Sequence, residues 1–205
     1  MKFLFPAISS LFILFAVAFK NKSVKDPDFT CVLTASKTNY EAGELPKFNV
    51  SIKNNSSKEV YLIGSLEKSD IQRRMPWCYF TVEKPKPDSF IIERCGFANP
   101  LRLQDFVKLK PGDSFDPYAV IDNYGFFPDD YIIDRRTFRN AGVYRIQFHY
   151  STNGNNTRRF YGSMSPGEQP GQWIKMLVSK VPKIDLESNI VEISIGSSIV
   201  NNSRF

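Results

Sequence analysis

The stretch AGVYRIQFHY, residues 141–150, alternates apolar and polar side chains and decides the fold class. Tyr144, Ile146 and Phe148 fall on one face of an extended chain, and the intervening polar residues fall on the other. A period of two is typical of a strand with one buried face. Residues 143–150 are therefore the strongest predicted strand in the chain.

Turn residues separate further segments of this kind along most of the sequence. Strands are expected at residues 30–36, 47–53, 59–63, 78–83, 90–95, 101–109, 114–121, 173–179 and 188–195. In Lys110-Pro111-Gly112-Asp113, Pro and Gly occupy the central positions that a type II turn favours. No helix is expected inside the domain. Many short strands with turns between them predict an all-β sandwich, with a barrel as the alternative.

The N-terminal segment has the layout of a secretory signal peptide. Lys2 precedes an apolar run, and Ala16-Val17-Ala18 fits a small-x-small cleavage site. The alternative is an uncleaved anchor, because the run approaches the roughly 20 residues of a membrane span. No later run could cross a membrane, so we expect a secreted, periplasmic or cell-envelope protein. The expected organisation is a signal peptide at 1–18, a linker at 19–29, one domain at 30–196 and a flexible tail at 197–205.

Basic residues exceed acidic ones, 27 to 21, which gives a formal net charge of +6. They are scattered along the chain and form no block of five or six like charges, a pattern typical of a solvated surface. We therefore expect no nucleic-acid partner. Attraction to acidic glycans, nucleic acid or anionic membranes would be weak and unspecific.

The segment around Tyr144 resembles the G-x-Y segment of immunoglobulin-like sandwiches. In those proteins a Tyr at the start of a late strand bonds its hydroxyl to upstream backbone, forming a tyrosine corner. The resemblance implies this role for Tyr144. Ala141 stands where the motif usually has an acidic residue, and Ile146 stands where antibody-type domains have Cys. The likeness is therefore to the broad immunoglobulin or fibronectin-III architecture.

A second resemblance lies in the order of four motifs. They are Tyr40-Glu41-Ala42-Gly43-Glu44, the alternating segment 48–54, Leu109-x-Pro111-Gly112-Asp113 and the Gly142/Tyr144 strand. This order resembles bacterial extracytoplasmic immunoglobulin-like modules and is similar to the bacterial intracellular proteinase inhibitor family. It implies an immunoglobulin-like antiparallel β-sandwich with long decorated loops over residues 30 to 150. Such turn and strand motifs specify fold better than function, and the export signal departs from an intracellular inhibitor.

Cys78 and Cys95 lie symmetrically within an expected hairpin whose midpoint falls between Lys86 and Pro87. In-register antiparallel pairing would place the two residues directly opposite, close enough for a disulfide. Export favours the oxidised form. Cys31 would then remain unpaired and buried.

No nucleophile, metal or phosphate-binding motif is recognisable, so we expect no enzyme, no cofactor and no metal site. His149 is the single histidine, and it is interpreted as a half-exposed strand residue. The acidic residues of segment 122–134 could offer oxygen ligands to calcium, although the interleaved aromatic residues favour a loop packed on the sheet. These residues are Asp122, Asp129, Asp130 and Asp134. Catalysis would require two carboxylates that only the fold could bring together.

Aromatic and Arg residues in the expected loops favour recognition, because rigid rings bury area at a low entropic cost. We therefore expect an exported, non-catalytic binding module that recognises a protein or glycan through loops at an end of the sandwich. The candidate contacts are Phe126, Phe127, Tyr131, Arg135, Arg136, Tyr161 and Trp173. The alternative is a secreted protease inhibitor that presents the Pro/Gly-rich loop 163–172 to a protease cleft.

Overall fold

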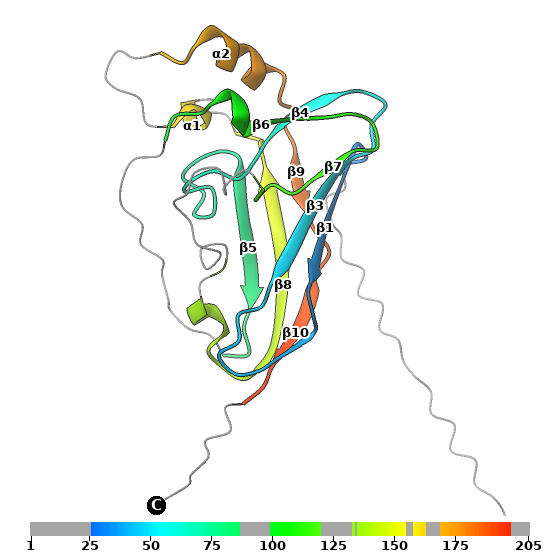
Figure 1. Cartoon of the computed structure of the whole chain (residues 1–205), viewed down its shortest axis with the longest axis vertical. Coiled ribbons are helices and arrows are strands. Elements are labelled where there is room, and N and C mark those ends of the chain that lie inside the picture. The colour runs from blue at the N-terminus through cyan, green and yellow to red at the C-terminus, as the bar shows by residue number, and fades with distance from the viewer. Residues whose placement is uncertain are drawn as a thin grey trace, which may run out of the picture.

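The computed structural model describes residues 26–86, 99–119, 133, 135–154, 158–162 and 169–197. The expected signal peptide, the end of the tail and the second strand of the expected hairpin lie outside these ranges. The described chain is all-β, with mostly antiparallel strands and only short helices (Figure 1). No helix in these ranges combines the length and apolar character needed to span a membrane.

The strand β8 (Gly142–Ser151) lies inside the larger sheet, whose order is β2-β10-β8-β5. Its neighbours are β10 (Val191–Ile195) and β5 (Trp77–Glu83), and the short strand β9 (Asp185–Glu187) pairs with the last residues of β8. These pairings are antiparallel, whereas β2 (Asn39–Tyr40) pairs with β10 in parallel.

The smaller sheet has the order β1-β3-β7. β1 (Phe29–Ala35) and β3 (Phe48–Asn54) pair along their whole length, so two of the expected strands are confirmed to within one residue. β7 (Ser114–Phe115) is much shorter than the strand expected there. β4 (Val60–Ile63) and β6 (Phe106–Leu109) form a separate pair, and the 3-10 helix η1 (Leu103–Asp105) precedes β6.

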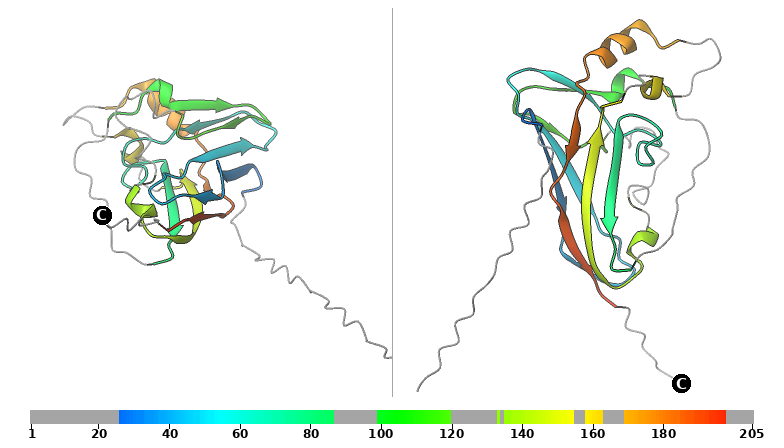
Figure 2. Two further views of the ribbon diagram at one scale, coloured as in Figure 1. Left: turned by 60° about the horizontal axis from the view of Figure 1, so that its bottom comes forward. Right: turned by 180° about the vertical axis from the view of Figure 1, so that it is seen from behind.

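The two sheets face each other across one apolar core. Leu33 and Ile52 reach it from the smaller sheet, and Ile146 and Phe148 reach it from the larger one; all four are at most 1% exposed. Seen from behind in Figure 2, β9, β10, β8 and β5 form the near layer, and β1 and β3 lie behind them. The alternation seen in the sequence therefore fills one shared layer between the sheets.

The start of β8 is fixed by a glycine and a tyrosine. Gly142 has a φ of +134°, and a Cβ at this position would lie 2.7 Å from the Cβ of Pro85, so no larger residue fits. The buried Tyr144 donates its hydroxyl to the carbonyl of Asn140 at 2.7 Å and accepts from the Asn140 N–H at 3.2 Å. Both bonds tie the first buried residue of β8 to the backbone just upstream of the strand.

The strand expected at residues 173–179 is wrong, because Gln172–Ser179 forms the helix α2. The adjacent apolar residues Trp173 and Ile174 already break a period of two. Ile174 and Val178 are four residues apart, so a helix places both on the face that packs against the domain. The length and spacing of this apolar segment fit a short helix better than a strand.

Candidate functional site

The residues expected to contact a partner fall at opposite ends of the molecule. Arg135 and Arg136 belong to the 3-10 helix η4 (Arg135–Phe138), which comes just before β8, whereas Tyr161 and Trp173 come after it. Ten strand residues span about 30 Å. In Figure 1, η4 lies at the lower end and α2 at the upper end. The remaining candidates, Phe126, Phe127 and Tyr131, lie outside the described residues.

The upper end, here called the α2 end, has an apolar cluster of its own. Its fully buried members are Ile63, Leu66, Met75, Leu101, Phe160 and Val178. The short helix α1 (Arg158–Tyr161) contributes Phe160, and Tyr161 packs partly buried against the same cluster. Tyr161 also accepts a backbone hydrogen bond from Leu101 at 3.2 Å. Tyr161 is therefore mainly a packing residue, and the cluster holds α2 in place.

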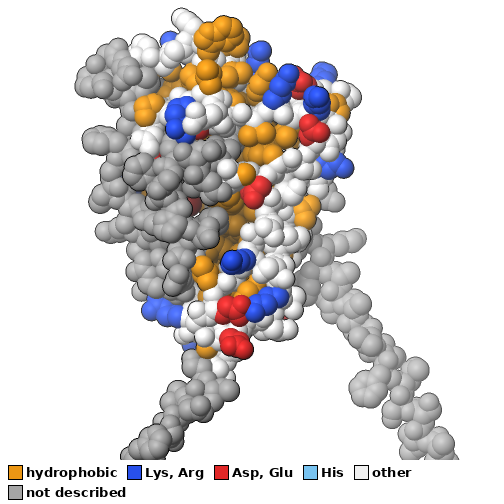
Figure 3. Space-filling view, viewed as in Figure 1, with side chains coloured by type: hydrophobic (Ala, Val, Ile, Leu, Met, Phe, Trp, Pro, Cys, Tyr) orange, Lys and Arg blue, Asp and Glu red, His pale blue; other side chains and the backbone are white. Residues whose placement is uncertain are grey.

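The opposite face of α2 is exposed. Trp173 is 69% exposed and Met176 is 37% exposed, and residues three positions apart lie side by side on a helix. Leu103 of η1, 58% exposed, belongs to the same end of the molecule. Figure 3 shows apolar side chains gathered over this end, with Lys and Arg around them and some Asp and Glu among these. We call Trp173, Met176, Leu103 and Lys180 the α2 surface, since Lys180 follows Trp173 by seven positions and so lies on the same side of the helix axis.

Positive charge predominates in the segment that contains α2. Residues 169–184 contain three lysines and no carboxylate. None of these lysines forms an ion pair with a described residue, whereas Lys108 is paired with Glu59 at 2.8 Å. The Lys180 ammonium lies 5.6 Å from the centroid of the Tyr61 ring. The arrangement combines protruding apolar groups with positive charge that is available to a partner.

The outer face of the larger sheet carries a polar row that was not apparent in the sequence. Tyr79, His149 and Glu187 are paired in register across β5, β8 and β9. The Tyr79 and His149 rings stack at 4.7 Å, and His149 Nε2 lies 2.9 Å from the hydroxyl of Thr81. Desolvation lowers the pKa of His149, and the Glu187 carboxylate raises it by a smaller amount. Only the pairing of distant strands creates this row, so no local signal could have revealed it.

Thr81, His149 and Glu187 have the chemical types of a hydroxyl–imidazole–carboxylate triad, but their geometry favours a structural role. The Glu187 carboxylate lies 3.7 Å from His149 Nδ1, too far for a hydrogen bond. Thr81 is exposed on an open strand, where water has free access to its hydroxyl. The row is best explained as cross-strand pairing that stabilises the sheet. Among the described residues, no group of three or more His, Cys, Asp and Glu could hold a metal ion.

Cys31 and Cys78 are buried free thiols in the core. Burial raises the pKa of Cys31 to about 12 and also raises that of Cys78, so neither is a thiolate near neutral pH. Because Cys78 is a free thiol here, it does not form the expected disulfide with Cys95, which itself lies outside the described residues. The four Asp residues considered for calcium also lie outside the described residues.

Comparison with known proteins finds no matching family model, no significantly similar curated protein and no significantly similar solved structure. The resemblances drawn from the strand and turn motifs therefore stay predictions. The function has to be inferred from the α2 surface itself.

Proposed function

We propose that this chain is an exported, non-catalytic binding module that holds its partner at the α2 surface. The observation that carries the proposal is the exposure of Trp173 on a helix whose other face is anchored. A protein and a glycan are the partner classes that the sequence favours. Export is supported by the layout of residues 1–18.

Several features indicate that the α2 surface binds a partner and that its apolar side chains are not exposed merely by chance. Single exposed apolar residues are common on protein surfaces, but here Trp173 and Met176 adjoin on one helical face and Leu103 lies at the same end. Trp is enriched among residues that dominate binding energies, because a rigid ring buries a large area with little loss of entropy. The helix is preorganised by its own core cluster, so binding would require little ordering.

We also infer that the fold is an immunoglobulin-like sandwich. The shared core of two facing sheets and the bonds of Tyr144 to Asn140 support this assignment. In such folds the ends of the sandwich carry the recognition loops. The position of α2 at one end agrees with that use.

The test measures binding of the purified, exported protein to an envelope fraction of the source organism. Binding should be lost when Trp173→Ala and Met176→Ala are combined, with an unchanged circular-dichroism spectrum. Val143→Ala is the matched control, because Val143 is 47% exposed at the start of β8, at the opposite end. Equal binding by the double variant and the wild type would refute the α2 surface as the contact site. Inhibition of serine or cysteine proteases at micromolar concentration would instead favour the inhibitor function.

A further inference from the structure

We propose that the partner of the α2 surface is the anionic face of a phospholipid bilayer. This rests on the proposed function for the site of contact, the α2 surface, and replaces the protein or glycan partner with a lipid surface. Trp173 and Met176 would enter the interfacial layer of the lipids, and Lys180 at the end of α2 would meet the headgroups. The module would then lie on a membrane without crossing it.

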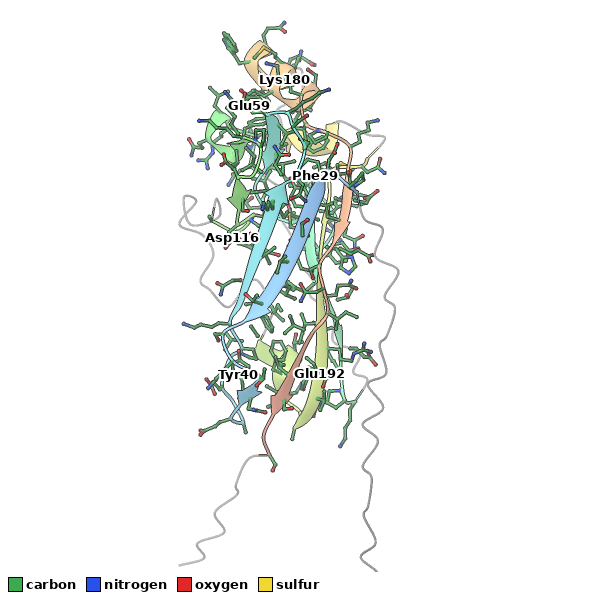
Figure 4. The ribbon with its side chains drawn as sticks, turned by 90° about the vertical axis from the view of Figure 1, so that its right-hand side faces the viewer. Phe29, Tyr40, Glu59, Asp116, Lys180 and Glu192 are labelled. Carbon is green, nitrogen blue, oxygen red and sulfur yellow. The ribbon has the colours of Figure 1, made fainter. Side chains whose placement is uncertain are left out.

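The shape of the surface suits a bilayer. The helix α2 lies at one extremity of the molecule, where Figure 4 labels Lys180. Trp173 and Met176 are the exposed apolar side chains of this helix, at 69% and 37%. A protruding indole needs a soft apolar medium or a matching cavity, and an interface supplies the former to its ring while leaving its N–H hydrated. The hydrophobic effect favours this burial, since Trp173 is largely wetted in the free protein and Met176 is partly so.

The charge of the surface selects an anionic bilayer. Lys180 forms no ion pair with a described residue, and no carboxylate interrupts residues 169–184. Glu59 lies at the same end in Figure 4, but its charge is balanced by Lys108. Each basic residue close to an anionic membrane adds a favourable attraction that falls off within a Debye length.

The kind of basic residue favours lipid over protein. Arg is enriched and Lys is depleted in protein–protein interfaces. A Lys side chain can lay its apolar stem along a membrane interface and extend its ammonium to the headgroups. Lysines beside Trp and Met thus match the composition of membrane-surface helices. A protein or glycan partner becomes an outcome of the experiment below.

The test measures co-sedimentation of the exported protein with vesicles of phosphatidylglycerol and phosphatidylcholine, and with vesicles of phosphatidylcholine alone. We expect binding to the anionic vesicles that weakens as salt is added. Trp173→Ala should reduce the affinity about tenfold or more. Lys180→Gln should reduce it about fivefold.

Two control variants keep the fold and alter the opposite end. Val143→Ala removes an exposed apolar group, and Lys47→Gln removes an exposed charge just before β3. Both should bind the anionic vesicles as the wild type does. A loss for Lys47→Gln equal to that for Lys180→Gln would indicate attraction by net charge alone and would overturn the inference. A loss for Val143→Ala equal to that for Trp173→Ala would overturn it too, because the contact would not be specific to the α2 surface.

The failure of this inference can be told apart from the failure of the proposed function. Absence of vesicle binding, together with envelope binding that still depends on Trp173, would overturn the lipid partner and favour a protein or glycan. If neither vesicle binding nor Trp173-dependent envelope binding is found, both the lipid partner and the role of the α2 surface as the contact site would be refuted. Binding to phosphatidylcholine as tight as to the anionic mixture would refute the role of the lysines.

Discussion

Removing the hydroxyl of Tyr150 should be one of the most damaging single-atom changes in the core. This hydroxyl donates to the carbonyl of Ile63 at 2.8 Å and accepts from the Ile63 N–H at 3.2 Å. It thereby joins β8 of the larger sheet to β4, and both residues are fully buried. Tyr150→Phe keeps the ring and removes both bonds.

The expected loss of stability follows from the backbone groups that Tyr150→Phe leaves without a hydrogen-bond partner. A buried backbone donor and a buried acceptor lose their partner, and no water can reach them. Leaving such groups unsatisfied costs about 1–3 kcal/mol each, so for the two groups we expect a loss of about 2–6 kcal/mol in the free energy of unfolding. For a chain of this size the midpoint of thermal unfolding should fall by about 4–24 °C.

Tyr144→Phe is the matched control. Tyr144 makes the same two bonds to Asn140, but Asn140 is only half-buried, so water can replace the lost hydroxyl. We expect a loss near 1 kcal/mol. The assay is urea unfolding followed by circular dichroism, with thermal melts as a second measurement. A cost for Tyr150→Phe equal to or below that of Tyr144→Phe would refute the proposed clamp between β8 and β4.

Three further predictions concern the core and the sheets. The His149 imidazole should titrate below 6.5 by NMR, and Glu187→Gln should lower its pKa further because the carboxylate raises it. His149 has a lower pKa in the folded protein than in the unfolded chain, so the unfolded chain takes up the proton at a higher pH. Its protonation should therefore reduce the stability of the fold as pH falls below 6.5. A measured pKa above 6.5 in the folded protein would contradict this prediction. The Asn189 side chain accepts from the Leu33 N–H at 2.9 Å and donates to the Leu33 carbonyl at 3.0 Å. Asn189→Ala should therefore lower the free energy of unfolding in urea by about 1–3 kcal/mol. An unchanged free energy would show that these bonds do not stabilise β1. Cys31, with its pKa raised to about 12, should resist alkylation at pH 8 in native protein and react in urea, as mass spectrometry of peptides would show; equal labelling in both states would refute its burial.

Local patterning was sufficient to predict the strands that bury one face. The alternation of residues 143–150 and 47–53 predicted β8 and β3, because side chains on opposite faces meet water and the core in turn. The Pro111-Gly112 pair also predicted its turn: Gly112 has a φ of +85°, and Asp113 donates to the Lys110 carbonyl at 3.0 Å.

Features that depend on distant partners could not be predicted in this way. The α2 surface faces water only because Val178 finds a core cluster made of residues from several other elements. The hydrogen bond between Tyr150 and Ile63 joins residues 87 positions apart in the chain, and no local sequence pattern near either residue predicts it. A short apolar segment such as 173–179 is compatible with strand or helix until its packing partner is known.

The fluorescence of Trp173 tests the central claim most directly. The chain has two Trp residues, and Trp77→Phe leaves Trp173 as the only reporter. Adding anionic vesicles to this variant should shift the emission to shorter wavelength and protect the indole from quenching by iodide, because the ring leaves water. Unchanged emission and quenching under conditions where the protein sediments with the vesicles would contradict the assignment of the α2 surface as the site of contact.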